Sequence, residues 1–180
     1  MNNRKAQAIL FDLGNTLVHF DAPWPDTFQE MADTLLQSLK KAGISIDEAD
    51  RFSQDFYQRL IINEPQQENG YKQVSATHNL IDLLKGYGFL EPDPRVVNHA
   101  LRKMFEIAEK YWTVENDTIQ TLLALKSHGY RLAIISNAED AVNVQQIINN
   151  ANIRDFFEVI IDSASYGFAK PGSAIFNEVL

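Results

Sequence analysis

The C-terminal part of the chain alternates between short apolar segments and helical patterns, and this alternation restricts the fold more than any other feature. Residues 131–136 (RLAIIS) and 157–162 (FEVIID) resemble strands, and RLAIIS is too uniformly apolar to face water on either side. Residues 8–11 (AILF) form a similar segment near the start of the chain. Helical patterns at residues 115–130 and 139–153 precede the two later strands. Strands that alternate with helices predict a parallel sheet joined by right-handed crossovers.

A long stretch with only helical patterns separates the first strand from this alternating region. Its apolar residues recur at helical spacing in four segments, at residues 23–43, 45–65, 71–88 and 93–112. Pro65 is predicted to end the second segment, and no strand is expected between residues 20 and 112. We therefore expect a discontinuous α/β core domain made of residues 1–18 and 114–180, with residues 19–113 inserted as a helical cap.

Composition and charge exclude several classes of partner. The 180 residues carry a formal net charge of −8, which opposes binding to the phosphates of nucleic acid. The chain has no cysteine, so disulfides and thiolate metal sites are excluded. No apolar stretch is long enough to span a membrane, and the first residues lack the apolar run of a signal peptide. We expect a cytoplasmic protein that binds neither nucleic acid nor membranes.

Polar side chains follow each of the three predicted strands. Asp12 follows the first strand, Ser136 and Asn137 end the second, and Lys170 lies downstream of the third. Because the carboxyl ends of parallel strands share one crevice, we expect these groups to converge. Asp12 could attack phosphorus to form an aspartyl-phosphate, while Ser136 and nearby backbone N–H groups hold the phosphoryl oxygens. Lys170 would offset the negative charge of the nucleophile and the phosphate together.

These residues stand in motifs that resemble those of the haloacid dehalogenase (HAD) superfamily of hydrolases. Residues 12–16 (DLGNT) are similar to the first motif of that family, residues 132–137 (LAIISN) to the second, and residues 169–176 (AKPGSAIF) to the third. The resemblance covers the whole chain. It implies a parallel Rossmann-like three-layer core with an inserted α-helical cap. It also implies a Mg²⁺-dependent phosphatase that acts on a small phosphorylated metabolite through an aspartyl-phosphate intermediate.

The same resemblance assigns roles to individual residues. Asp12 corresponds to the nucleophile, and Lys170 to the second catalytic residue. Asp12 and the backbone carbonyl of Gly14 correspond to Mg²⁺ ligands. The substrate-binding residues that the motifs imply are Thr16, Ser136 and Asn137.

Gly14 departs from the usual pattern, because most phosphatases of the family carry a second Asp at this position as general acid and base. Glycine keeps the backbone carbonyl but removes proton transfer, a loss of roughly two to four orders of magnitude in rate if nothing replaces it. Relatives with other chemistry also lack this Asp, so a 2-haloacid dehalogenase-type hydrolase is the alternative. Those dehalogenases carry a bulky aromatic residue here, and glycine cannot fill that space.

A second departure concerns the fourth motif of the family, an acidic pair that completes the Mg²⁺ site. The sequence ends at Leu180, before the position where that pair is expected. We therefore expect a C-terminally truncated form with the last sheet strands missing, and a catalytically inactive family member is a further alternative. The strand at residues 8–11 would then pair on one side only, and its bare apolar edge predicts a homodimer or aggregation.

The remaining polar and aromatic candidates are interpreted as structural. The four histidines show no metal-ligand spacing, although His19 follows the nucleophile loop and could face the site. Asp162 at the end of the third strand is a weak candidate for a ligand. Aromatic residues that flank the two predicted hinges are interpreted as cap packing, namely Phe20, Trp24, Tyr111 and Trp112.

Overall fold

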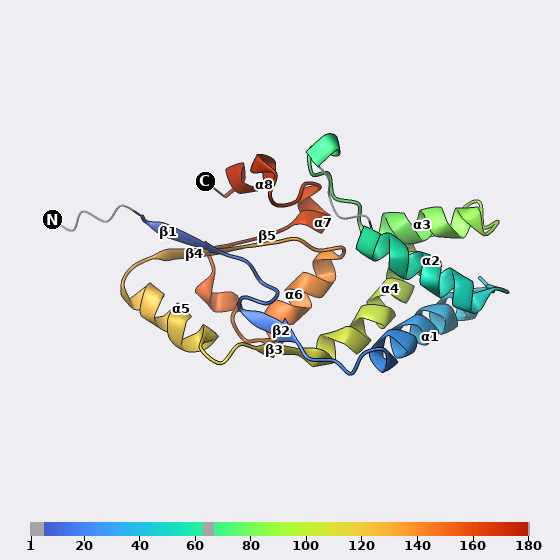
Figure 1. The fold of residues 1–180 in the computed structure, drawn as a ribbon, viewed down its shortest axis with the longest axis horizontal. Coiled ribbons are helices and arrows are strands. Elements are labelled where there is room, and N and C mark those ends of the chain that lie inside the picture. The colour runs from blue at the N-terminus through green and yellow to red at the C-terminus, as the bar shows by residue number, and fades with distance from the viewer. Residues whose placement is uncertain (1–5, 63–66, 180) are drawn as a thin grey trace.

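Three parallel strands form the sheet that organises the chain. The computed structural model describes residues 6–62 and 67–179, and Pro65, the predicted helix stop, lies outside them. The described strands β1 (Ala8–Phe11), β4 (Arg131–Ser136) and β5 (Val159–Asp162) lie in the order β1-β4-β5. Both pairs are parallel, which confirms the predicted α/β sheet. The carboxyl ends of the strands point toward the helical part of the molecule (Figure 1).

Short helices flank this sheet on both sides. Figure 1 draws α5 (Thr118–Ser127) and α6 (Ala141–Asn150) below the strands, and α7 (Ser163–Tyr166) and α8 (Ser173–Asn177) above them. Side chains of β4 alternate between the two sides, and all of its residues after Arg131 are buried. One buried cluster joins β4 to α5 and α6 and contains Leu122, Leu132, Ile134, Val144, Ile147 and Ile148.

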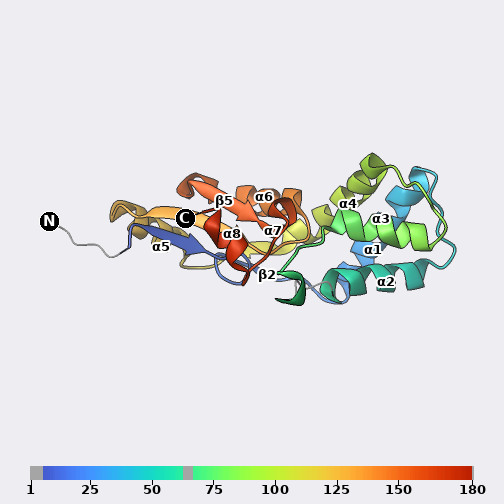
Figure 2. The same ribbon diagram turned by 90° about the horizontal axis from the view of Figure 1, so that it is seen from above.

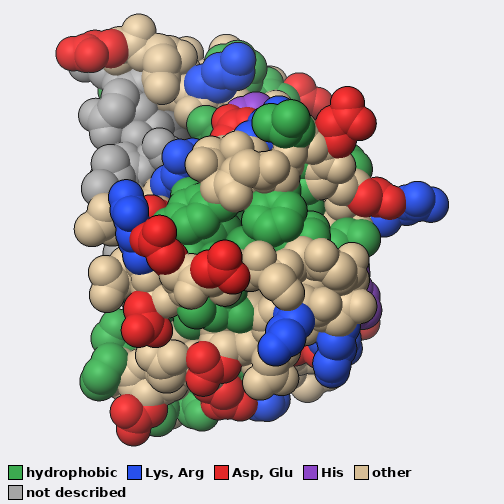
Figure 3. All heavy atoms as spheres, turned by 90° about the vertical axis from the view of Figure 1, so that its right-hand side faces the viewer, with side chains coloured by type: hydrophobic (Ala, Val, Ile, Leu, Met, Phe, Trp, Pro, Cys, Tyr) green, Lys and Arg blue, Asp and Glu red, His purple; other side chains and the backbone are tan. Residues whose placement is uncertain are grey.

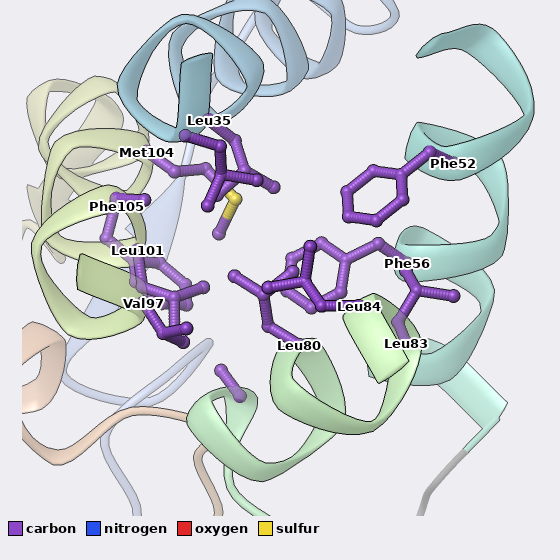
Figure 4. Close-up of a cluster of buried hydrophobic side chains, with 13 residues drawn as sticks. Leu35, Phe52, Phe56, Leu80, Leu83, Leu84, Val97, Leu101, Met104 and Phe105 are labelled. Atoms are coloured by element: carbon purple, nitrogen blue, oxygen red, sulfur yellow. The ribbon is translucent and has the colours of Figure 1, made fainter. Parts of the chain in front are cut away.

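Four helices form a second unit with a core of its own. They are α1 (Asp26–Lys41), α2 (Ala49–Ile62), α3 (Ala76–Gly86) and α4 (Pro94–Ala108). Ser75 and Asp93 accept hydrogen bonds from backbone N–H groups at the starts of α3 and α4, as N-cap residues do. Side chains from all four helices point toward one another in a buried apolar cluster (Figure 4), whose members include Leu35, Phe52, Phe56, Leu80, Leu84 and Leu101.

A two-stranded ribbon connects this helical unit to the sheet, contrary to the prediction that residues 20–112 contain no strand. Strand β2 (Val18–Phe20) pairs antiparallel with β3 (Trp112–Val114). The fourth predicted helix therefore ends at Ala108, and a 3₁₀ turn at Glu109–Tyr111 leads into β3. The helical pattern predicted for residues 93–112 is therefore too long at its end, because tertiary pairing with β2 places Trp112 in a strand. Two further 3₁₀ turns lie at Gln67–Asn69 and Arg154–Phe156.

The helical unit and the sheet unit lie beside each other along the long axis of the molecule (Figure 2). Backbone hydrogen bonds tie them together away from the ribbon. The Ala76 N–H donates to the carbonyl of Glu139 at 2.8 Å, and the Gln73 N–H donates to the carbonyl of Gly167 at 3.0 Å. The segment before α3 is therefore fixed to loops that follow β4 and β5.

The outer end of the molecule, where the helical unit faces the viewer, has apolar side chains at its centre and acidic and basic side chains around them (Figure 3). Both signs of charge are present on this face, so it is not a uniformly basic surface of the kind that binds nucleic acid. Among the described residues, no helix combines the length and apolar character that crossing a membrane requires.

Strand β1 is less covered than its neighbour. None of its four residues is buried, whereas five of the six residues of β4 are buried. Within the described part of the chain, β1 pairs with β4 alone. One backbone edge of β1 is therefore left without a strand, as the sequence predicts.

Candidate active site

An ion pair between the first strand and the C-terminal region defines the candidate active site. Lys170 Nζ donates to Asp12 Oδ1 at 2.6 Å and to the carbonyl of Ile135 at 2.7 Å. The Leu13 N–H donates to the same Asp12 oxygen at 2.8 Å. Asp12 Oδ2 has no hydrogen bond to any described residue, and the side chain is 46% exposed. The carboxylate is thus oriented through one oxygen and open to a substrate through the other.

Asn137 holds the backbone of Lys170 in place. Its Oδ1 accepts from the Lys170 N–H at 2.8 Å, and its Nδ2 donates to the Lys170 carbonyl at 3.0 Å. The side chain that the sequence assigns to substrate binding therefore also positions the lysine. Ser136 is buried at the end of β4, and its hydroxyl donates to the Asn137 carbonyl at 3.4 Å.

Gly14 lies in the tight turn after Asp12, against the indole of Trp112. A Cβ at position 14 would lie 3.5 Å from Trp112 Cη2, which is ordinary van der Waals contact. Asn15 follows with a φ of 58°, in the left-handed region that Asn tolerates, and its N–H donates to the carbonyl of Val18 at 2.6 Å. The turn therefore brings β2, and with it the ribbon that carries Trp112, directly over the nucleophile loop.

Asp12, Gly14, Ser136, Asn137 and Lys170 all line one cavity of about 270 Å³. Its lining comes from the ends of β1 and β4, the start of α6, the ribbon and the loop of Lys170. The titratable side chains in that lining are Asp12, Glu139 and Lys170. Asn143 also lines the cavity, and its buried Oδ1 has no hydrogen-bond partner among the described residues. The site thus combines a carboxylate, an ammonium group and polar groups that can hold oxygen atoms.

Glu139 is the titratable residue in this cavity that the sequence analysis missed. It had been read as the first residue of a helix, whereas α6 begins at Ala141 with Asp140 as its N-cap. Water reaches the Glu139 side chain from the cleft, yet surrounding protein atoms desolvate the carboxyl. This desolvation is the main cause that raises its pKa above the usual value, and the negative charge of Asp140 adds to it. A hydrogen bond from its own backbone N–H acts in the opposite direction.

Three other candidates from the sequence lie outside this cavity. Thr16 is exposed and is not part of the cavity lining. Asp162 is buried and caps α7, where it accepts from the Ser165 N–H and hydroxyl at 2.8 and 2.9 Å. His19 lies on the ribbon with Nδ1 3.2 Å from Glu115 Oε1, near the connection between the two units.

The described residues offer few ligands for a metal ion. They contain no group of three or more His, Cys, Asp or Glu side chains that could hold one. Asp12 supplies one free carboxylate oxygen, and Gly14 supplies an uncharged carbonyl. Mg²⁺ takes six oxygen ligands in near-octahedral geometry, including one or two carboxylates. The ammonium of Lys170 beside Asp12 also repels a second cation. These residues alone therefore do not fit a Mg²⁺ site.

The model of the haloacid dehalogenase-like hydrolase family matches residues 6–180. The chain therefore belongs to this family, which confirms the resemblance that the three motifs indicate.

Individual relatives agree with this assignment. The glyceraldehyde 3-phosphate phosphatase of Methanothermobacter thermautotrophicus is 41% identical over 64 residues, which are 36% of this chain and 28% of that protein. The protein of the same name from Methanopyrus kandleri is 24% identical over 173 residues, 96% of this chain and 68% of its own length. The crystal structure of a HAD phosphatase from Thermococcus onnurineus shares the fold, with a TM-score of 0.55 and 20% identity over 96% of this chain and 69% of that chain. The chain thus spans about two thirds or less of these proteins.

The raised pKa of Glu139 predicts a pH-dependent stability. The folded protein binds this proton more tightly than the unfolded chain, so the free energy of unfolding falls as the pH rises from the unfolded-state pKa through the folded-state pKa. Glu139→Gln removes this fall. We expect the variant to gain stability over the wild type with rising pH, and the difference to vanish below about pH 4. Urea unfolding across this range measures it, with Glu91→Gln, an exposed loop glutamate, as the control. Parallel curves for Glu139→Gln and the wild type would contradict the raised pKa.

Proposed function

We propose that this hydrolase is a phosphatase that acts on a small phosphorylated metabolite through an aspartyl-phosphate on Asp12. The observation that carries the proposal is the 2.6 Å contact between Lys170 Nζ and Asp12 Oδ1, with Asp12 Oδ2 open to the cavity. Relatives named glyceraldehyde 3-phosphate phosphatase support phosphate esters as the substrate class. The cavity is of a size that suits the phosphate group and the first atoms of its ester.

The proposed reaction uses the groups at the strand ends. Asp12 Oδ2 attacks phosphorus, the bond to the leaving oxygen breaks, and the phosphoryl group is transferred to the carboxylate. Lys170 offsets the charge that builds up when a carboxylate and a phosphate dianion approach each other. Ser136 and the backbone N–H groups of the following loop hold the phosphoryl oxygens, while Asn137 keeps Lys170 in position. Water then cleaves the aspartyl-phosphate.

Substitution of the nucleophile tests this proposal directly. Asp12→Asn keeps the shape of the side chain but removes the charged oxygen that attacks phosphorus. We expect release of phosphate from an aryl phosphate to fall by at least about 10³-fold, as for loss of a covalent nucleophile. Phosphate release is measured by colorimetric assay, and Glu91→Gln is the matched surface control. Equal activity of Asp12→Asn and the wild type would refute the assignment of the nucleophile.

Carbon–halogen hydrolysis by the same Asp12 is the second candidate, and one contact favours it. The indole of Trp112 lies against Gly14 and supplies aromatic volume that the sequence alone had not placed there. Displacement of halide also needs no acid to protonate the leaving group. If the protein released halide from a 2-halocarboxylate but no phosphate from phosphate esters, it would be a dehalogenase-type hydrolase and not a phosphatase. Absence of both activities in the wild-type chain would favour a catalytically inactive family member.

We infer that Mg²⁺ assists this site only with ligands beyond Asp12 and the Gly14 carbonyl. When bound, the ion would neutralise phosphoryl oxygens as a Lewis acid. Because one carboxylate and one carbonyl make a weak donor set, we expect the 180-residue chain to bind Mg²⁺ no more tightly than roughly millimolar. Isothermal titration calorimetry measures this affinity, and Asp12→Asn serves as the control for specific binding. Micromolar affinity that Asp12→Asn abolishes would contradict the inference.

We also propose that the free edge of β1 pairs with a second copy of the chain. The strand is uncharged and apolar, and such an edge is a template for further pairing. We expect a dimer or larger species in sedimentation velocity runs at micromolar concentration. Ala8→Lys places a charge on the exposed start of this strand and should shift the distribution toward monomer. A wild-type monomer with a cooperative melt would contradict the proposal.

A further inference from the structure

The proposed phosphatase lacks an obvious source of the proton that its leaving group requires. An alkoxide leaves poorly unless it is protonated as the bond to phosphorus breaks, and Gly14 has no side chain to supply that proton. Among the described residues that line the cavity, the titratable side chains are Asp12, Glu139 and Lys170. Asp12 is the nucleophile, and the ammonium of Lys170 is held by Asp12 and by the Ile135 carbonyl. Glu139 is the group that remains.

We propose that Glu139 is the general acid and base of this site and takes over the role that Gly14 cannot perform. The inference rests on the proposed phosphatase function and names a further catalytic residue for it. It places the proton donor on the loop after β4, just before the N-cap residue of α6.

The position of Glu139 suits a contact with the leaving group. It lines the active-site cavity and also an adjoining cleft of about 510 Å³ between the sheet unit and the helical unit. Of the residues that line the two spaces, Glu139 is common to both. A substrate whose phosphate lies in the active-site cavity and whose ester group extends into the cleft would therefore pass Glu139. The bridging oxygen, which must receive the proton, lies between the phosphorus and that ester group.

The backbone around Glu139 is held on both sides, so its side chain starts from a fixed point. The Ala138 N–H donates to the buried hydroxyl of Ser163 at 2.9 Å. The Glu139 carbonyl accepts from the Ala76 N–H of the helical unit at 2.8 Å. Asp140 caps α6 through the Asn143 N–H at 2.7 Å. The Glu139 carboxyl forms no ion pair with a described residue, and its hydrogen bond comes from its own backbone N–H, so no neighbouring side chain holds it away from a substrate.

The direction of the pKa shift of Glu139 also suits an acid. Desolvation raises the pKa of its carboxyl, and the neighbouring Asp140 raises it further. The charged or titratable groups that share its two spaces are Asp12 and Lys170 on one side and Asp140, His99 and Arg102 on the other. A bound phosphate dianion adds negative charge beside it and favours the protonated form again.

Glu139 would transfer a proton in both steps of the reaction, the formation and the hydrolysis of the aspartyl-phosphate. As Asp12 Oδ2 forms its bond to phosphorus, the bond from phosphorus to the ester oxygen breaks, and that oxygen takes the proton of the Glu139 carboxyl and leaves as an alcohol. The resulting Glu139 carboxylate then accepts a proton from water, whose oxygen attacks phosphorus. The bond between phosphorus and Asp12 breaks, which releases phosphate and restores both carboxyl groups to their starting states.

Leaving groups of different basicity test the role of Glu139. In Glu139→Gln, we expect hydrolysis of an alkyl ester such as glycerol phosphate to fall by about 10²- to 10⁴-fold. With 4-nitrophenyl phosphate the leaving group needs no acid, so a rapid burst of nitrophenolate close to one per protein chain should remain, followed by slow turnover. Stopped-flow absorbance measures the burst, and acid quench traps the aspartyl-phosphate.

Two further variants separate chemistry from structural damage. Glu139→Asp keeps a carboxyl at this position and should retain part of the alkyl phosphatase activity that Glu139→Gln loses. Gly14→Asp, added to Glu139→Gln, returns an acid to the cavity and should raise the alkyl phosphatase activity of that variant by at least about tenfold. Glu91→Gln is the control without effect. Wild-type rates in Glu139→Gln, or equal losses of alkyl turnover and of the aryl burst, would overturn the role of Glu139 while the phosphatase function stands. No phosphate release by the wild-type protein would overturn both.

Discussion

The contact between Asp12 and Lys170 is the interaction on which the rest of the site depends. These residues are 158 positions apart, and they meet only because β1 lies parallel to β4 and the loop after α7 returns to the same end of the sheet. Both side chains are partly exposed, so the pair contributes little to stability. Its importance for the proposed function is chemical, because it places a positive charge beside the carboxylate that would approach a phosphate.

The second constraint is the connection between the two units. The ribbon of β2 and β3 leaves the nucleophile turn and returns from α4, so it sets Trp112 over Gly14. On the other side, hydrogen bonds from the segment before α3 fix the loop that carries Glu139. Parts of the chain that belong to or contact the helical unit therefore line the cavity at Trp112 and at Glu139. A movement of that unit would change the surroundings of both Gly14 and Glu139.

The site also illustrates how proton transfer can be separated from the nucleophile turn. In the pattern that the first motif resembles, nucleophile and acid stand two residues apart on one turn. Here the turn keeps Asp12, and the cavity is also lined by Glu139 on a neighbouring loop, whose pKa is raised mainly by desolvation. Desolvation and the negative charge of Asp140 raise the pKa of this carboxyl, and a raised pKa is the direction that suits an acid catalyst. The position of that proton donor would then favour substrates whose ester group extends into the cleft between the units.

The sequence by itself determined the order of strands and helices, the parallel sheet, and the polar residues Asp12, Ser136 and Lys170 that end or follow its three strands, because apolar periodicity and short motifs are local properties of the chain. Only the tertiary structure decided the ribbon at Val18–Phe20 and Trp112–Val114, since these strands pair across more than 90 residues and each is too short to show a pattern. It also decided the surroundings of Glu139, because desolvation depends on atoms brought together from distant segments, and no residue type or spacing encodes it.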